Sequence, residues 1–270
     1  MQQRPQQQRS SQADFESRHP APAPIESTIE RALTDAMHDV RELNSLVRQN
    51  AEQLGQKTQF DRAGQPLNLD SATADQLRAN LSTVLQTTYL LTTRLAILDY
   101  ELNEEALTRE ARYSGVLYAK YDKARLVLLA KAKQARVWIQ MKGTSHLYFD
   151  IYSSFDLLPF LLIENALKYS PPDQQIDVAF EDNREYLDII VRSLGPVVTD
   201  DEIEKIFDRG VRGANARASQ PKGTGLGLYV ADIIAKIHGF ELWAHSDSSA
   251  LEIGRIPHSI FTISLRAYRT

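Results

Sequence analysis

Residues 163–172, IENALKYSPP, end an apolar helical run with three polar groups in five positions. Asn165 and Lys168 are three residues apart, so a helix presents them on one face. The side-chain oxygen of Asn165 can bind Mg²⁺. Glu164 can accept a proton or orient a reacting group, and the Tyr169 ring can stack on a flat base. This pattern predicts a nucleotide–Mg²⁺ site. The alternative is a polar helix end that is capped before the two prolines.

A second site signal is KGTGLGL, residues 222–228. Gly223, Gly225 and Gly227 directly precede an expected helix, and glycine permits both positive φ and close approach of a ligand to the backbone. The free N–H groups of a helix start suit phosphate, and Lys222 adds positive charge. The spacing differs from a P-loop. A tight turn into the helix is the alternative for this motif taken alone.

The segment before these glycines, residues 206–221, is long, polar and basic, with Arg209, Arg212 and Arg217 among small residues. A long segment of this composition next to a glycine-rich helix start predicts a mobile lid over phosphate. By itself it is equally compatible with a solvated basic loop.

Composition limits the other possibilities. The 270 residues are 43% hydrophobic and carry a formal net charge of −4, which predicts no attraction to nucleic acid. The absence of cysteine excludes disulfides and thiol catalysis. The longest apolar run, residues 157–163, is too short to span a bilayer. We therefore expect a soluble, cytoplasmic protein without direct membrane insertion.

The chain divides into three parts. Residues 1–24 are rich in Gln, Pro and Ser and predict a disordered tail. Residues 25–108 contain two apolar seams with a period of 3.5, which predicts an antiparallel helical hairpin. Dimerisation into a four-helix bundle would cover the exposed seams. The alternative is a hairpin that packs against its own chain.

Residues 115–270 mix strand and helix patterns and predict an α+β domain in which one sheet is covered by three helices. The expected helices span about 116–135, the segment containing residues 163–169, and about 225–238. Residues 198–222 are expected to be irregular. The remaining alternating, β-branched segments predict strands.

Three segments together resemble the ATP-binding domain of sensor histidine kinases, in the superfamily that includes gyrase B and Hsp90. ENALKYSP resembles the N box, IFDRG the F box, and KGTGLGLYVADIIAKIHG the G2 box. The resemblance implies a Bergerat-type α/β sandwich that binds ATP and Mg²⁺. It implies that Asn165 binds the metal and that Glu164 assists phosphoryl transfer. The other implied nucleotide contacts are Lys168, Tyr169, Ser193, Gly195, Arg212, Lys222, Gly223, Thr224, Gly225, Leu226 and Gly227.

The sequence departs from the family pattern at two places in this domain. Leu161 stands where the family usually has an Asn, one turn before the metal ligand. The G1 box reads SLGPV, so Ser193 replaces the Asp that accepts from the adenine amino group, and Val197 replaces the second glycine. A neutral hydroxyl accepts a hydrogen bond more weakly than a carboxylate does.

The expected phosphoacceptor is His38, which is the only histidine in the two seam helices and faces away from the seam. MHDVRELN resembles the H box, and Asp39 matches the acidic residue that follows its histidine. Neutral imidazole is nucleophilic near pH 7, and Asp39 can orient the ring or accept its proton. Glu42 and Leu43 replace the usual Thr or Asn and the usual Pro, so phosphatase activity is not expected.

The resemblance implies autophosphorylation of His38 and transfer of the phosphoryl group to a separate response-regulator receiver. Two alternatives stay open. One is a dimeric ATP-controlled switch without histidine phosphorylation. The other is an ATPase of the same superfamily that phosphorylates a hydroxyl on another protein, with the hairpin as a scaffold. The remaining histidines form no metal-binding pattern, and His238 resembles the structural His-Gly that closes the G2 helix.

Overall fold

A computed structural model describes residues 111–248 and 251–269, together with residues 59–60 and 66–67 and scattered positions between 72 and 95. The expected tail over 1–24 and most of the expected hairpin over 25–108 lie outside the described residues. The scattered positions from 72 to 95 are helical, and Thr83, Thr87 and Thr88 each donate a hydroxyl hydrogen bond to the carbonyl four residues earlier. The described part contains no helix with the length and apolarity that a bilayer crossing requires.

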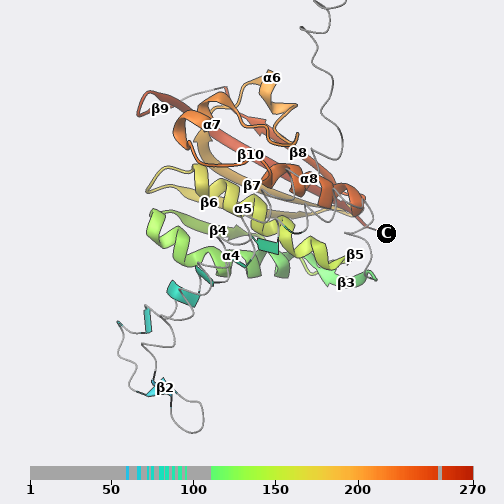
Figure 1. Cartoon of the computed structure of the whole chain (residues 1–270). Coiled ribbons are helices and arrows are strands. Elements are labelled where there is room, and N and C mark those ends of the chain that lie inside the picture. The colour runs from blue at the N-terminus through green and yellow to red at the C-terminus, as the bar shows by residue number, and fades with distance from the viewer. Residues whose placement is uncertain are drawn as a thin grey trace, which may run out of the picture.

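The domain is built on a mixed sheet (Figure 1). Its strands lie in the order β4 (Trp138–Lys142), β6 (Gln175–Asp182), β7 (Tyr186–Pro196), β10 (Ile256–Tyr268) and β8 (Glu241–Ser246), and β9 (Leu251–Ile253) pairs with β10. Only β4 and β6 run parallel; the other pairs are antiparallel. The alternating pattern of β6 and β7 directs one set of side chains into the core and the other set outward.

Three helices cover one face of this sheet, as the sequence predicts (Figure 1). They are α4 (Leu117–Ala135), α5 (Leu157–Tyr169) and α8 (Gly227–Ile237), and α5 packs between the other two. Nine of the thirteen residues of α5 are buried. Pro159 lies in its first turn, where a missing N–H costs no helical hydrogen bond. The α+β sandwich inferred from the sequence is therefore confirmed.

Two regions differ from expectation. The segment at 198–222, expected to be irregular, contains the short helices α6 (Asp200–Ile203) and α7 (Ala214–Ser219). The strand β5 (Tyr148–Ile151) does not join the main sheet. It pairs with β3 (Tyr113–Val116), which the sequence pattern missed, and Gly115 leaves room there for the Ile151 side chain. A further pair of two-residue strands, β1 (Gln59–Phe60) and β2 (Pro66–Leu67), lies in the N-terminal part.

His238 closes α8 as a structural residue. Its Nδ1 lies 2.6 Å from the Ile234 carbonyl oxygen, and its Nε2 accepts a hydrogen bond from the Tyr152 amide at 3.0 Å. The ring is therefore a neutral imidazole with its proton on Nδ1. Burial lowers the pKa of His238, and the nearby positive charge of Arg112 lowers it further, although the hydrogen bond to the Ile234 carbonyl acts in the opposite direction.

This environment makes folding stability depend on pH. The unfolded imidazole gains a proton as the pH falls through about 6.5, whereas the folded imidazole resists protonation until a lower pH. We expect the free energy of unfolding to be highest above pH 6.5 and to fall as the pH decreases toward the folded pKa. Urea unfolding between pH 5 and 8 measures this slope, and His238→Gln should flatten it. An unchanged slope in His238→Gln would contradict the assignment.

Candidate functional site

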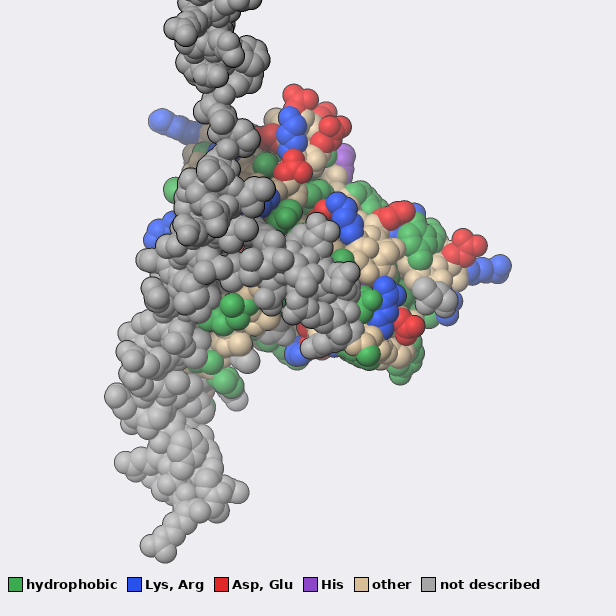
Figure 2. All heavy atoms as spheres, turned by 45° about the vertical axis from the view of Figure 1, so that its right-hand side comes forward, with side chains coloured by type: hydrophobic (Ala, Val, Ile, Leu, Met, Phe, Trp, Pro, Cys, Tyr) green, Lys and Arg blue, Asp and Glu red, His purple; other side chains and the backbone are tan. Residues whose placement is uncertain are grey.

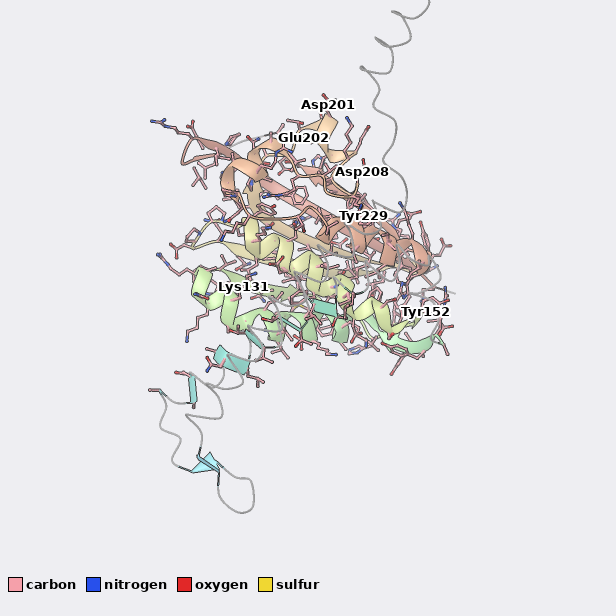
Figure 3. All side chains as sticks on the ribbon, viewed as in Figure 1. Lys131, Tyr152, Asp201, Glu202, Asp208 and Tyr229 are labelled. Atoms are coloured by element: carbon pink, nitrogen blue, oxygen red, sulfur yellow. The ribbon has the colours of Figure 1, made fainter. Side chains whose placement is uncertain are left out.

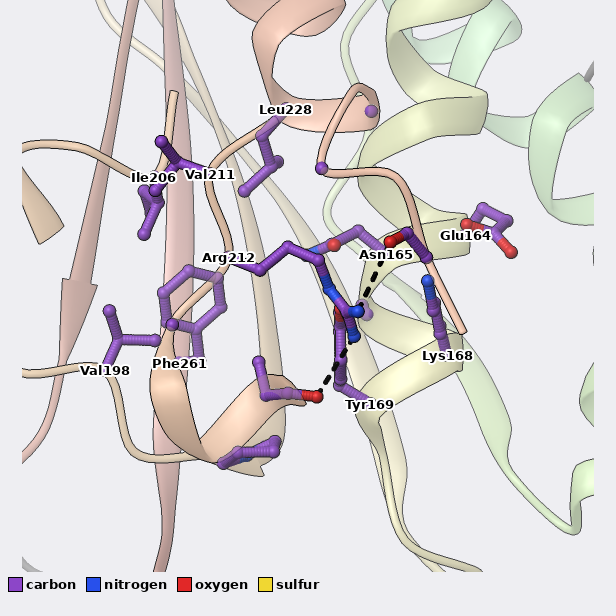
Figure 4. Close-up of a pocket in the computed structure, with 18 of the residues that line it drawn as sticks. Glu164, Asn165, Lys168, Tyr169, Val198, Ile206, Val211, Arg212, Leu228 and Phe261 are labelled. Carbon is purple, nitrogen blue, oxygen red and sulfur yellow. Dashed lines mark hydrogen bonds between the residues drawn. The ribbon is translucent and has the colours of Figure 1, made fainter. Parts of the chain in front are cut away.

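A cavity of about 540 Å³ opens between α5 and the turn that precedes α8 (Figure 4). Its size falls within the range of small-molecule binding sites. Residues 164–169, the end of β7, residues 211–216 and residues 222–228 all contribute to its wall. Segments that are about 60 residues apart in the sequence thus face a single space, and the polar end of α5 lines it directly.

The α5 wall carries Asn165 and Glu164, which interrupt the buried face of the helix. Lys131 of α4 forms an ion pair with Glu164, at 2.6 Å between Nζ and Oε1 (Figure 3 shows Lys131). This pair holds the Glu164 carboxylate in position and reduces its negative charge near the cavity. Lys131 could not be predicted from a local pattern, because it lies 33 residues before Glu164 in a helix without a recognisable motif.

Lys168, one turn after Glu164, also lines the cavity and is directed toward the glycine turn. A Cβ built at Gly223 would lie 2.5 Å from the Lys168 Nζ. Burial lowers the pKa of Lys168; Glu164 opposes this effect, while the charges of Arg212 and Lys131 add to it. Lys131, Lys168 and Arg212 therefore form a cationic cluster with one carboxylate, an arrangement that a polyphosphate would neutralise.

The glycine turn is shaped by close backbone contact. Gly225 has a φ of +71°, and its carbonyl accepts a hydrogen bond from the Gly210 amide at 3.2 Å. A Cβ at this position would lie 2.5 Å from the Gly210 carbonyl carbon and 2.7 Å from the Val211 oxygen. Helix α8 begins two residues later, and its first amides have no partner within the helix. The start of α8 therefore lies at the wall of the cavity.

Gly225→Ala is expected to displace residues 210–211 and to weaken nucleotide binding by about tenfold or more, because the added methyl group has no free space. Gly254→Ala is the matched control: Gly254 also has positive φ (+57°), but nothing lies within 4 Å of its Cβ position. In the control, the free energy of unfolding should fall by about 1 kcal/mol, because alanine is strained in the left-handed conformation, and nucleotide affinity should not change. Titration calorimetry and urea unfolding compare the two variants. Equal nucleotide affinities would contradict the role of the turn.

The segment between β7 and α8 is anchored by Glu202. Thr199 and Glu202 form a capping box at α6, and Glu202 Oε1 also accepts a hydrogen bond from the Ala214 amide at 2.7 Å, at the start of α7. These hydrogen bonds lower the pKa of Glu202, although its partial burial acts in the opposite direction. Acidic side chains gather at the protruding α6 end (Figures 2 and 3). Glu202 therefore links α6, which precedes the expected lid, to α7 within it.

Arg212 forms hydrogen bonds to the backbone of the segment between β7 and α8. Its guanidinium donates to the Tyr169 hydroxyl at 3.2 Å and to the carbonyls of Ala216, Pro221 and Gly223 at 3.1–3.3 Å, as well as to that of Gln220. Figure 4 shows the Arg212 side chain crossing the cavity toward Tyr169. The residue expected to contact phosphate thus also holds the lid backbone against α5.

The opposite end of the cavity is apolar. Val198, Ile206, Val211, Leu228 and Phe261 gather there, away from Glu164, Asn165 and Lys168 (Figure 4). Ser193 lies in this part, because it is the cross-strand partner of Phe261. A cavity with one apolar end and one cationic, amide-lined end suits a molecule that has a flat apolar part and a charged part.

The structure brings together in this one cavity all the residues expected at the nucleotide site, from Glu164 to Gly227, including Ser193, Gly195, Thr224 and Leu226. Leu161, at the position where the family usually has Asn, also lines it. The predicted phosphoacceptor His38 and its neighbour Asp39 lie outside the described residues.

The oxygen-bearing side chains of the cavity determine how Mg²⁺ could bind there. No group of three or more His, Asp or Glu side chains in the described part is arranged to hold a metal ion by itself. Asn165 offers one oxygen, and Glu164 is engaged by Lys131. A single neutral ligand fits Mg²⁺ that arrives with a polyphosphate and takes its remaining ligands from phosphate and water.

Part of this chain is similar in sequence to a family of ATPases. Residues 160–268 match the family described as histidine kinase-, DNA gyrase B-, and HSP90-like ATPase. Over 87 residues the chain is 39% identical to the sensor histidine kinase WalK of Bacillus subtilis, and over 86 residues it is 28% identical to the probable sensor kinase SilS of Salmonella typhimurium. Each match covers 32% of this chain but only 14% of WalK and 17% of SilS.

Among solved structures, the catalytic domain of the histidine kinase ThkA has a TM-score of 0.47 and 18% identity, and the match covers 58% of this chain and 98% of that one. The family match contains Asn165, the lid segment and the glycine turn, which are the segments that surround the cavity. The match over residues 160–268 thus identifies a histidine kinase-like ATPase domain in this chain.

Proposed function

We propose that this chain is an ATP-dependent protein histidine kinase that phosphorylates its own His38 and passes the phosphoryl group to an aspartate of a separate receiver domain. The observation that supports this most is the cavity in which Asn165 faces the 223–227 turn, with Lys168 and Arg212 at the same end. The partial relatives, which are sensor kinases, support the same class.

In this proposal the two ends of the cavity have different roles. The apolar end around Phe261 receives the base, and the cationic end receives the triphosphate. Asn165 would hold Mg²⁺, which neutralises charge on the transferring phosphoryl group when it is bound. The amides of the 223–227 turn and Lys168 offset further phosphate charge.

Transfer itself would occur at an imidazole nitrogen of His38. The nitrogen lone pair forms a bond to the γ-phosphorus, and the bond between that phosphorus and the β–γ bridging oxygen breaks, so that ADP leaves with the electron pair. The proton on the other ring nitrogen passes to Asp39 or to solvent. Glu164, held by Lys131, would orient the reacting group. Dimerisation through residues 25–108 would bring His38 and a cavity together.

Incubation of the full chain with γ-labelled ATP and Mg²⁺ tests this function. A phosphorus–nitrogen bond is labile in acid and stable in alkali, so the expected label on the protein has these properties. Tight ATP binding without label would support the alternative of a nucleotide-controlled switch. Label on the hydroxyl of an added partner would support the alternative of a scaffolded kinase.

A further inference from the structure

The apolar end of the cavity carries the hydroxyl of Ser193. Ser193 is 5% exposed and lines the cavity, and within the described residues its side chain makes no hydrogen bond. Its neighbour across the sheet, Phe261, is 9% exposed and also lines the cavity. Cross-strand partners share one face of the sheet, so the hydroxyl and the ring are directed to the same space. Because this hydroxyl opens onto the cavity and makes no hydrogen bond to the described residues, it can bond to a molecule placed there.

No carboxylate competes with this hydroxyl at the apolar end. Among the residues that line the cavity, the one acidic side chain is Glu164, which lies at the opposite end and is paired with Lys131 (Figure 4 shows Glu164). The side chains that surround the apolar end are otherwise aliphatic or aromatic, for example Ile206 and Val211. Ser193 is therefore the side chain that would form hydrogen bonds to the polar edge of a base bound at the apolar end.

A hydroxyl can form hydrogen bonds with a base that a charged acceptor cannot form. It rotates, and it either accepts a hydrogen bond from an amino group or donates one to a carbonyl oxygen. An ionised carboxylate only accepts, so it would repel a carbonyl oxygen in the same position. A site loses most affinity when a buried polar group is left unpaired, and Ser193 remains paired with either edge.

We infer that Ser193 gives this site relaxed base selectivity, so that it binds purine nucleoside triphosphates with a 6-oxo group about as well as those with a 6-amino group. This inference rests on the proposed nucleotide site and deepens it by naming the substrate class. Inosine triphosphate is the best probe, because it differs from ATP only at the 6-position and the adjacent ring nitrogen and lacks the 2-amino group of guanine.

Titration calorimetry on the full chain with Mg²⁺ compares ATP and inosine triphosphate. For the unmodified protein we expect dissociation constants within about tenfold of each other. Ser193→Asp should raise the preference for ATP to about 100-fold or more, chiefly by weakening inosine triphosphate. Ser193→Ala should weaken both nucleotides alike and leave the ratio unchanged. Ser114→Asp, on exposed β3, is the control for an added carboxylate and should change neither constant.

A preference for ATP above about 100-fold in the unmodified protein would overturn the inference even if Ser193→Asp fails to fold. So would a folded Ser193→Asp variant with an unchanged ratio. If neither nucleotide binds, both the inference and the proposed function fail. If both nucleotides bind with dissociation constants within about tenfold of each other but no acid-labile label forms, the kinase proposal fails and relaxed selectivity stands.

Discussion

Replacing His38 with alanine is expected to remove all acid-labile label from the protein while leaving ATP affinity within about twofold of the original value. The reason is chemical: alanine has no nucleophile, and the described residues that line the proposed nucleotide cavity all lie between 161 and 261. Autoradiography after an alkaline wash measures the label, and calorimetry measures the affinity.

His245→Ala is the matched control for this experiment. His245 is exposed, and its Nε2 lies 3.4 Å from Asp247, so it reproduces the pairing of a histidine with a nearby carboxylate that we expect at His38 and Asp39. The control should label normally. Full labelling of His38→Ala would show that the phosphoacceptor is another residue, and the role assigned to the hairpin would have to be abandoned.

Asn165→Ala is the second change with a large expected effect. Removal of the carboxamide leaves two side-chain oxygen groups on the α5 wall, and both are engaged: Glu164 is paired with Lys131, and the Tyr169 hydroxyl accepts from Arg212. We expect the initial rate of labelling to fall by about 100-fold or more, in line with the loss of a group that stabilises transition-state charge. The measurement is the initial rate across a Mg²⁺ titration at saturating ATP.

Asn183→Ala serves as control, because Asn183 lies at the turn between β6 and β7 and bonds to Tyr186 rather than lining the cavity. It should label at the normal rate. The metal role of Asn165 would be contradicted if Asn165→Ala kept the normal rate and the normal dependence on Mg²⁺.

Much of the ATPase domain could be predicted from the sequence, because its signals are local. The alternation in β6 and β7 and the apolar run of α5 result directly from burial. The glycines at 223–227 mark a tight turn, in which Gly225 leaves no room for a Cβ. The nucleotide-site residues could be grouped because their motifs resemble a known family. Their meeting in one cavity is a property of the fold.

The features that sequence reasoning missed depend on distant contacts. Helix α7 is short and polar, and it is held by Glu202, twelve residues before it. One local signal was present, since Thr199 and Glu202 have the spacing of a capping box. Lys131 had no such signal, because its role follows from how α4 packs beside α5 at the cavity. The hairpin and His38 remain predictions.

Titration calorimetry of the full chain with ATP and Mg²⁺ tests the central claim most directly, namely that a metal-bound triphosphate lies between Asn165 and the turn at 223–227. The account predicts saturable one-site heat that weakens when the metal is chelated and in Asn165→Ala. Absence of heat with every purine nucleoside triphosphate in the presence of Mg²⁺ would contradict it.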